Sequence, residues 1–449
     1  MLDIAINHGT VIDTVSRKQQ KLHIGIKEGQ IVTISESPLE ASTMIDASSL
    51  IVSPGFIDPH GHIDGYEYSG ELSVCQGITT SVGGNCGLSP IDLKEFFGKQ
   101  TEQGFPLNQA ELIGHSFSLR KEVGIKDVYT KASGEQLLKM EALAEQALKD
   151  GACGISFGLD YSPGASMEEV MTLARLCAKY NRVMPIHTRL FTLYDLYSLY
   201  EILSIAKHTN VKLLISHFVY QYGEGILEDA LKIVDKAIGQ GMPIMIDSGM
   251  YTDWATFIGT ATFDEQTLGD NNIAFSNLVV ATGTHLGKTL NRNLYNELRK
   301  DYPNEAVICF TGQPEDVYQC LTRPYCMPST DIGTYQKGEG HPQIAGTYPK
   351  YFREMVRERQ LLTIEEAVAK ATIIPAEFFG FTMKGRIAIG ADADITVFDI
   401  RTINDKARFP NEGAPDAKPT GIPYVIVNGQ LVVNHGEYTG TRAGKVIKA

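Results

Sequence analysis

Long apolar runs are absent from this chain of 449 residues. Their absence argues against a membrane-spanning helix, which needs about 18 or more consecutive apolar residues. The opening segment, MLDIAINHGTVIDTVSRK, also lacks the basic stretch and the apolar core of a secretory signal. We therefore expect a cytoplasmic protein with no membrane partner.

Basic residues are in the minority, and no basic block interrupts the chain. There are 40 Lys and Arg against 53 Asp and Glu, a formal net charge of −13, which argues against a nucleic-acid partner. The seven cysteines include no CxxC pair, and Cys320 and Cys326 lack the further Cys or His that would complete a zinc knuckle. An odd number of scattered cysteines is typical of a reducing compartment.

The two ends of the chain share one pattern. Residues 1–52 and 385–449 consist of short alternating apolar and polar segments separated by Gly and Asn, which is the pattern of strands and hairpins. In VNGQLVV, the Asn-Gly pair supplies the positive φ angles of a tight turn. Each end is too small for a domain, so we predict one small β-sandwich domain assembled from both termini.

Residues 53–384 alternate short apolar runs with amphipathic helical stretches. VMPIHT and VKLLISHF, for example, each precede a long helical segment, and repeated βα units predict a buried parallel sheet. About eight units fit, so the predicted fold class is α/β, a (β/α)8 TIM-like barrel, with a doubly wound sheet as the alternative. The polar segment at about 252–304 is predicted to be an insertion of the kind that often covers an active site.

Metal-capable side chains follow several of the apolar runs. Functional residues of a barrel lie at the C-terminal ends of its strands, and the candidates there are His60, His62, Cys86, His187, His217 and Asp331. A single histidine at such a place is most often structural, but this whole set is hard to explain by packing. Zinc prefers His nitrogen and Cys thiolate, and a nearby carboxylate can carry protons. The parts needed to hydrolyse an amide-like bond are therefore present.

The motifs PGFIDPHGH, GITTSVGGNCG, PIHTR, LLISH, PSTD and GADADITVFD resemble the amidohydrolase superfamily. Within it, the chain is most similar to the N-acyl-D-amino-acid deacylases, over nearly its whole length. The resemblance implies a tightly held Zn²⁺ on Cys86, His187 and His217, and a second, weaker position at His60 and His62. It also implies that Asp331 is the general acid/base. No lysine ends CGISFGL, where many amidohydrolases carry a carboxylated lysine between two metals, so the bridging role falls to Cys86.

The expected anchors for a substrate carboxylate are incomplete. The family uses a lysine, an arginine and a tyrosine; here the first two positions are Val219 and Gln343, while Tyr251 matches the tyrosine. Because an unpaired buried charge is costly, either another cation replaces them or the substrate lacks that carboxylate. Arg189 is a candidate anchor, with a structural salt bridge as the alternative. His341 is a candidate substrate contact, with loop packing as the alternative.

The predicted function is zinc-dependent hydrolysis of an amide bond, most like that of an N-acyl-D-amino-acid deacylase. A cyclic amidase of the hydantoinase or dihydroorotase type, or a deaminase, uses the same metal chemistry and stands as the alternative. A non-catalytic scaffold is a third interpretation, which the joint presence of the metal-capable residues disfavours. The predicted partner is a small-molecule amide. The sequence leaves open the substrate's identity and stereochemistry, and the oligomeric state, a homo-oligomer included.

Overall fold

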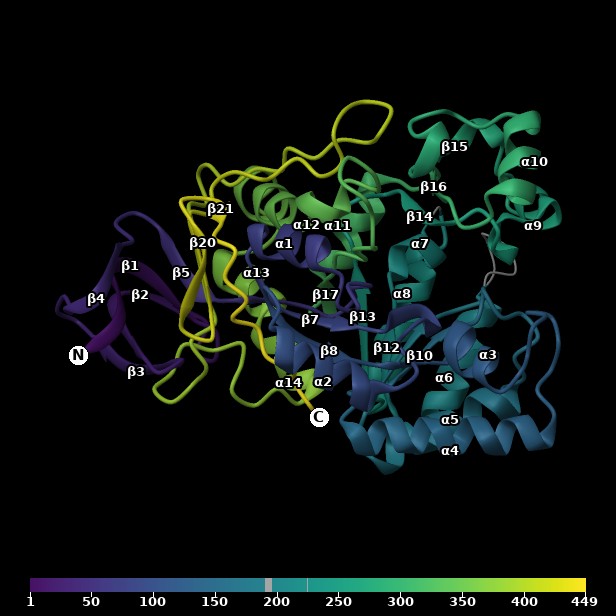
Figure 1. Ribbon diagram of the computed structural model, residues 1–449, viewed down its shortest axis with the longest axis horizontal. Helices are drawn as coiled ribbons and strands as arrows, with labels where there is room; N and C mark the ends of the chain where they lie inside the picture. Colours follow the sequence, from purple (N-terminus) through teal and green to yellow (C-terminus); the bar gives the residue numbers. More distant parts are fainter. Residues whose placement is uncertain (190–195, 224) are drawn as a thin grey trace.

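The structure is a computed structural model that describes residues 1–189, 196–223 and 225–449. Within these residues the strands form a nine-stranded sheet, a six-stranded sheet and two three-stranded sheets. Figure 1 shows the strands from both chain ends gathered at one side of the molecule, while the remaining strands are surrounded by helices. No helix among the described residues has the length and apolar character that crossing a membrane requires.

Strands from the two chain ends share the nine-stranded sheet. Its order is β21-β20-β19-β18-β5-β1-β2-β3, with β4 paired to β1. The antiparallel pairing of β5 with β18 joins the two ends, and Asn428 and Gly429 both have positive φ in the predicted hairpin turn. That the sheet belongs to a separate two-layer sandwich stays a prediction. The strands are β1 Leu2–Asp13, β2 Lys18–Lys27, β3 Gln30–Ser35, β4 Ala41–Asp46, β5 Ile51–Pro54, β18 Ile395–Phe398, β19 Tyr424–Val427, β20 Gln430–Asn434 and β21 Glu437–Tyr438.

The central strands run parallel in two groups, ordered β6-β7-β8 and β17-β13-β12-β11-β10-β9. Leu112 alone separates β8 from β9, and an isolated bridge between Gly61 and Ile332 links the segments that follow β6 and β17. Nearly every residue of these strands is buried, which is why they appear as short apolar runs. The strands are β6 Phe56–Asp58, β7 Ile78–Gly83, β8 Asn108–Glu111, β9 Ile113–Gly114, β10 Ile155–Gly158, β11 Val183–His187, β12 Lys212–Ile215, β13 Ile244–Ser248 and β17 Cys326–Pro328.

Amphipathic helices follow most of the parallel strands and pack around them (Figure 1). Helix α4 shows how the sequence sets the limits of one: Ser133 and Gln136 form a capping box at its start, and Gly151, at φ 117°, ends it. The helices are α1 Glu67–Cys75, α2 Leu93–Gln103, α3 Arg120–Glu122, α4 Gly134–Asp150, α5 Met167–Lys179, α6 Tyr197–Thr209, α7 Phe218–Tyr222, α8 Leu227–Gly239, α11 Pro314–Thr322, α12 Gln343–Tyr351, α13 Ile364–Ala371 and α14 Ile373–Phe379.

The segment predicted as an insertion forms a small unit with its own sheet and core. Strands β14 (Trp254–Phe257), β16 (Ala306–Cys309) and β15 (Leu278–Val280) pair antiparallel in that order. Helices α9 (Glu265–Asp270) and α10 (Arg292–Asp301) lie beside them at the upper right of Figure 1. The insertion predicted at about 252–304 stays a prediction, and the central strand β16 of this unit follows shortly after residue 304.

Candidate metal centre and active-site hollow

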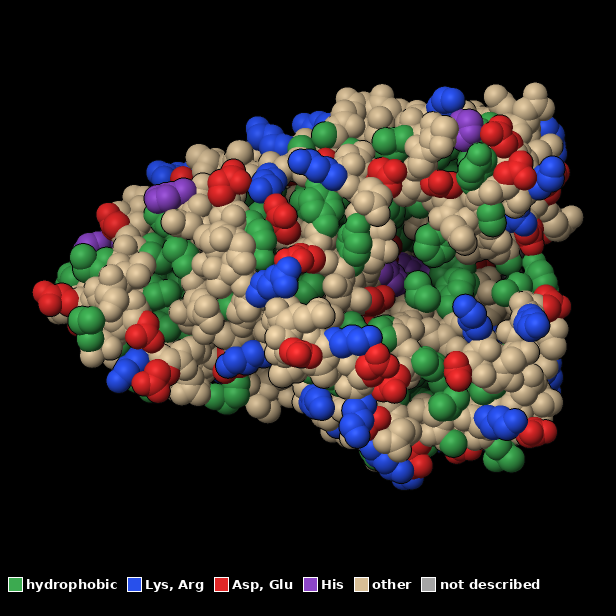
Figure 2. Space-filling view, viewed as in Figure 1, with side chains coloured by type: hydrophobic (Ala, Val, Ile, Leu, Met, Phe, Trp, Pro, Cys, Tyr) green, Lys and Arg blue, Asp and Glu red, His purple; other side chains and the backbone are tan. Residues whose placement is uncertain are grey.

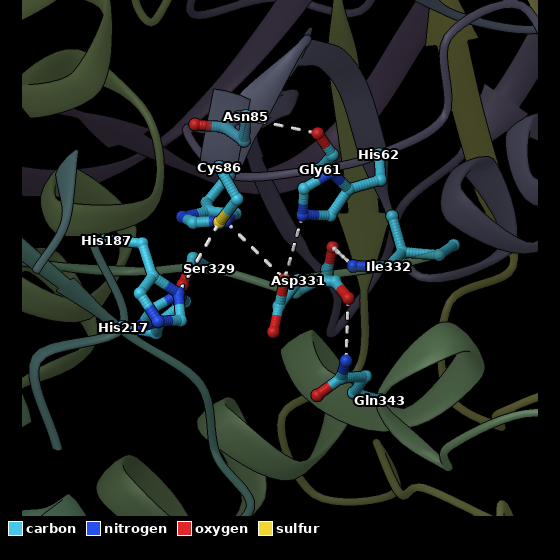
Figure 3. A network of polar contacts seen from close by, with 12 residues as sticks. Gly61, His62, Asn85, Cys86, His187, His217, Ser329, Asp331, Ile332 and Gln343 are labelled. Atoms are coloured by element: carbon cyan, nitrogen blue, oxygen red, sulfur yellow. Dashed lines mark hydrogen bonds and ion pairs between the residues drawn. The ribbon is translucent and has the colours of Figure 1, made fainter. Parts of the chain in front are cut away.

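Four predicted ligands converge where the parallel strands end. The sulfur Sγ of Cys86 lies 3.4 Å from Nε2 of His60, 3.6 Å from Nε2 of His217 and 3.9 Å from Nδ1 of His187. The last two nitrogens are themselves 2.9 Å apart. Figure 3 shows Cys86, His187 and His217 pointing toward one another from different strand ends. We refer to Cys86, His60, His187 and His217 as the ligand cluster.

Asp331 adjoins the ligand cluster on the side of His62. Its Oδ1 lies 3.2 Å from Nε2 of His62 and 3.5 Å from Nε2 of His60, and the three residues form a second group that could hold a metal ion. Burial alone would raise the pKa of Asp331, but the hydrogen bond from His62 and the charges of His60 and His217 lower it below its usual value. The carboxylate is therefore ionised at neutral pH and can accept a proton.

The backbone turns sharply at three of these positions. Cys86, His217 and Asp331 have φ angles of 49°, 33° and 51°, in the left-handed region that non-glycine residues rarely adopt and that is often found at functional sites. The turn at Cys86 is tightly enclosed: a Cβ on Gly158 would lie 2.2 Å from the Cys86 carbonyl oxygen. Glycine on β10 therefore lets the Cys86 turn pack against the neighbouring strand.

The charges in the ligand cluster favour a thiolate. Burial alone would raise the pKa of Cys86, but the charge of His60 and the hydrogen bonds from His187, His217 and His60 lower it well below its usual value. Burial alone would lower the pKa of His60, but Asp247 and Cys86 raise it well above its usual value. A metal cation that replaced these protons would be bound by the anionic sulfur of Cys86.

Asp247 supports the ligand cluster and was missed by the sequence reasoning. It is fully buried, accepts hydrogen bonds from the His217 backbone N–H at 2.9 Å and the Ser329 hydroxyl at 2.7 Å, and lies 3.4 Å from Nδ1 of His60. Such partners orient metal-binding histidines. The available signal was its place in MPIMIDSG, near the end of β13, where the other strands carry their ligands.

Asp58, at the end of β6, likewise stabilises the backbone around the site. Its carboxylate accepts hydrogen bonds from the backbone N–H groups of His60, at 3.3 Å, and Thr330, at 3.0 Å, and from the Thr330 hydroxyl. Burial raises its pKa to about 7 despite these bonds. These contacts tie the strand end that carries His60 to the one that carries Asp331.

A hollow opens beside the ligand cluster, and Figure 2 shows histidine at its floor with hydrophobic side chains around it. This hollow is a cavity of about 120 Å³ whose lining includes His62, Asp64 and Asp331. The small unit supplies part of its wall, through Ala255, Thr256 and Phe257 of β14 and Ala306 of β16. A second hollow of about 40 Å³ shares Tyr161, His217, Ala255 and Asp331 with it and extends toward Asp160 and Trp254.

The structure does not bring Arg189 into either hollow. Its guanidinium bonds Glu201 at 3.0 Å and the carbonyl oxygens of Pro163, at 2.9 Å, and Ala165. These contacts engage all three guanidinium nitrogens. This arrangement favours the structural salt bridge, the alternative that the sequence left open.

Val219 and Gln343 are buried but line neither hollow. The Gln343 side chain donates from Nε2 to the Asp331 carbonyl oxygen at 2.6 Å (Figure 3), while its buried Oε1 has no partner among the described residues. Val219 is the second residue of α7, which begins directly after His217. The contacts therefore give Gln343 a role in holding the Asp331 backbone.

Tyr251 and His341 pack against each other, with ring centroids 5.2 Å apart. Tyr251 faces a separate cavity of about 410 Å³, which shares no lining residue with the first two hollows. His341 is fully buried, and burial lowers its pKa to about 3. Its Nδ1 accepts a hydrogen bond from the Gln343 backbone N–H at 3.1 Å, which favours the packing alternative for His341.

Sequence similarity to known proteins identifies the family of this chain. A sequence profile described as the amidohydrolase family matches residues 51–432. An N-acyl-D-glutamate deacylase of Alcaligenes xylosoxydans xylosoxydans is 30% identical over 96% of this chain and 93% of its own length. A D-aminoacylase of the same organism is 28% identical over 99% of this chain and 97% of its own length. The chain therefore belongs to the amidohydrolase family, as the motif resemblance predicted.

Solved structures agree with this assignment. A D-aminoacylase structure superposes with a TM-score of 0.88 at 27% identity, and covers 100% of both chains. The N-acyl-D-glutamate deacylase of Bordetella bronchiseptica, solved with zinc and a phosphonate that mimics the tetrahedral intermediate, has the same TM-score and coverage at 28% identity. An L-hydantoinase from Arthrobacter aurescens, at 16% identity and a TM-score of 0.64, shares the fold.

Proposed function

We propose that this chain is a zinc-dependent hydrolase of linear amide C–N bonds that uses the chemistry of the N-acyl-D-amino-acid deacylases. The observation that carries this proposal is the convergence of a buried thiolate, several histidines and the ionised carboxylate of Asp331 at one end of the parallel strands. The similarity to deacylases over nearly the whole chain supports it, as does the relative solved with zinc and a phosphonate mimic of the tetrahedral intermediate.

The donor atoms fit zinc. A tetrahedral zinc lies about 2.3 Å from a thiolate and about 2.0 Å from His nitrogen, which puts sulfur and nitrogen about 3.5 Å apart. The distances from Cys86 to its three histidine neighbours, 3.4, 3.6 and 3.9 Å, bracket that value. We assign the tight position to Cys86, His187 and His217, and a second, weaker position to His60 and His62 with Cys86 between them.

Asp331 would move the protons. When bound, zinc would polarise the amide carbonyl and make water more acidic at this site. Asp331 would accept a proton from the attacking water and pass it to the departing nitrogen. His62 holds Oδ1 of that carboxylate at 3.2 Å, and the Gln343 amide holds the Asp331 backbone at 2.6 Å. The proton-carrying group is therefore fixed on both sides.

We also propose that the parallel strands close into a (β/α)8 barrel. Counting β8 and β9 as one interrupted strand, the ring would run β6, β7, β8/β9, β10, β11, β12, β13 and β17. The short interval at Leu112 and the bridge between Gly61 and Ile332 support closure. The barrel would span residues 53–384, with 1–52 and 385–449 as the composite β domain and an insertion from about 252 to the end of β16.

Metal analysis with an activity assay tests the function. We expect the purified chain to retain about one zinc and to release amine from N-acetyl compounds, with activity lost on chelation and restored by zinc. A preparation that neither holds zinc nor gains activity from it would overturn the proposal. Hydantoin and dihydrouracil belong in the same panel, because hydrolysis of these rings without hydrolysis of linear amides would favour the cyclic-amidase alternative.

A further inference from the structure

The two hollows meet at Asp331, so a linear amide could extend from the reacting carbonyl in two directions. One hollow carries Asp64 in its wall, and the other carries Asp160. Asp64 accepts a hydrogen bond from the Gly84 backbone N–H at 2.8 Å, and Asp160 accepts one from the Thr262 hydroxyl at 2.6 Å. Each half of a bound substrate would therefore face a carboxylate that the protein holds in place.

Neither hollow offers a lysine or arginine side chain to a substrate. No Lys or Arg is among the described residues that line them, and the remaining residues, 190–195 and 224, include no Lys or Arg in the sequence. The positive charge there belongs to the histidines of the ligand cluster and any metal they hold. The Cys86 sulfur lies 3.4 Å and Oδ1 of Asp331 lies 3.5 Å from Nε2 of His60, so these two acidic groups stand against that positive charge.

Three cations that could be considered as carboxylate anchors are directed elsewhere or lie outside both hollows. Arg189 is held by Glu201 and two carbonyl oxygens. Lys350 lies over the Tyr251 ring, 4.2 Å from its centroid, and lines the separate cavity of about 410 Å³. Lys337 is exposed, two residues beyond the wall residue Tyr335. A substrate carboxylate in either hollow would thus be desolvated without a lysine or arginine partner, which disfavours binding.

We propose that the substrate is an N-acyl amine in which neither the acyl half nor the amine half carries a carboxylate or other anion near the amide. This inference rests on the proposed amide hydrolysis and names its substrate class. It separates this chain from the N-acyl-D-glutamate and N-acyl-D-aspartate deacylases that it resembles, whose substrates are amino-acid derivatives. Asp64 and Asp160 are the residues we expect to exclude such anions.

A matched substrate series tests this. Zinc-loaded enzyme is assayed for amine release from N-acetyl-leucine, N-acetyl-leucinol and N-acetyl-isopentylamine, with both enantiomers of the first two. We expect kcat/KM for the alcohol or the amine to exceed that for the acid by about tenfold or more. An acid that reacts as well as its neutral analogues overturns the inference and leaves the proposed hydrolase intact. No turnover of any linear amide overturns both.

Charge variants test the physical cause. Thr334 is an exposed residue in the wall of the first hollow, so Thr334→Lys adds a cation and Thr334→Gln is its neutral control. We expect Thr334→Lys to raise kcat/KM for the acid relative to Thr334→Gln by about fivefold or more, with little change for the alcohol. Lys337→Met and Lys350→Met should leave the acid's kcat/KM unchanged. A loss of about tenfold in either would identify a carboxylate anchor and overturn the proposal.

Discussion

The ligand cluster and the walls of the two hollows are built in different ways. Every residue of the ligand cluster lies at or just beyond the end of a parallel strand, and its side chains meet because those ends meet. The walls combine residues beside the ligands, such as Asp64, with residues of β14, β16 and the segment around Gly333–Tyr335, which are distant in sequence from most of the ligands. Side chains predicted for substrate binding, such as Arg189 and Tyr251, line neither hollow. The order of the parallel strands thus brings the metal ligands together, whereas the hollow walls also depend on how the small unit packs over those strand ends.

The contrast between the ligand cluster and the hollow walls is tested first by Asp331→Asn, which should have the largest effect. Zinc should stay bound, because the ligand cluster is intact, while kcat should fall by about 10²- to 10⁴-fold for want of a proton carrier. Metal content and steady-state kinetics measure the two effects separately. Asp64→Asn, which alters the other carboxylate of the same hollow, should cost much less turnover. Near-normal turnover by Asp331→Asn would contradict its assigned role.

The two metal positions are distinguished by Cys86→Ala and His62→Ala. Cys86 is close to three histidines, whereas His62 belongs only to the group with His60 and Asp331. Zinc content after dialysis should therefore fall close to zero in Cys86→Ala and change little in His62→Ala. Equal losses in both variants would make the pair of His60 and His62 the primary site.

Asp247→Asn tests whether the carboxylate beside the ligand cluster contributes to zinc affinity. Removing the charge beside His60 should lower zinc affinity by about 10- to 100-fold, measured by competition with a chelator. Asp253→Asn is a suitable control, because Asp253 is a buried carboxylate that lines the separate cavity. An unchanged zinc affinity in Asp247→Asn would show that the strand ends alone position the ligands.

Arg189→Gln is expected to have the smallest effect on activity. KM should stay within about twofold of the original value, while the free energy of unfolding falls by about 1–3 kcal/mol because Glu201 loses its partner. Arg189→Lys, which keeps the charge, should recover part of that stability. A tenfold rise in KM with unchanged thermal stability would instead make Arg189 a substrate anchor, and would weaken the contrast between ligands and walls.

Many strands and helices could be predicted from the sequence, because each depends on a pattern of residues that are close together in the chain. Apolar runs followed by amphipathic helices indicated the parallel strands, and Asn428 with Gly429 indicated the hairpin that the structure shows. The family assignment was also predicted and is confirmed. The pairing of β16 with β14 and β15 on its two sides could not be predicted, because such partnerships are not visible in a local stretch of sequence.

The walls could not be predicted in the same way, because side-chain direction depends on neighbours from elsewhere in the chain. Gln343 reaches the Asp331 carbonyl oxygen, and Tyr251 packs against His341 and faces another cavity. Asp247 lies near the end of β13, but its role could not be predicted, since a carboxylate in an apolar run has no single expected role. Its contacts with His60, His217 and Ser329 became visible only in three dimensions.

The sequence by itself determined the residues available for metal chemistry and their places at strand ends. In a parallel βα arrangement those ends share one edge, so the chemistry-bearing residues were bound to meet there. Only the tertiary structure decided the charge that a substrate would encounter. The partners of Arg189 and Lys350 turn these cations away from the hollows, whereas Asp64 and Asp160 remain in the walls. Because a desolvated anion needs a nearby cation, this placement of charges disfavours an anionic substrate.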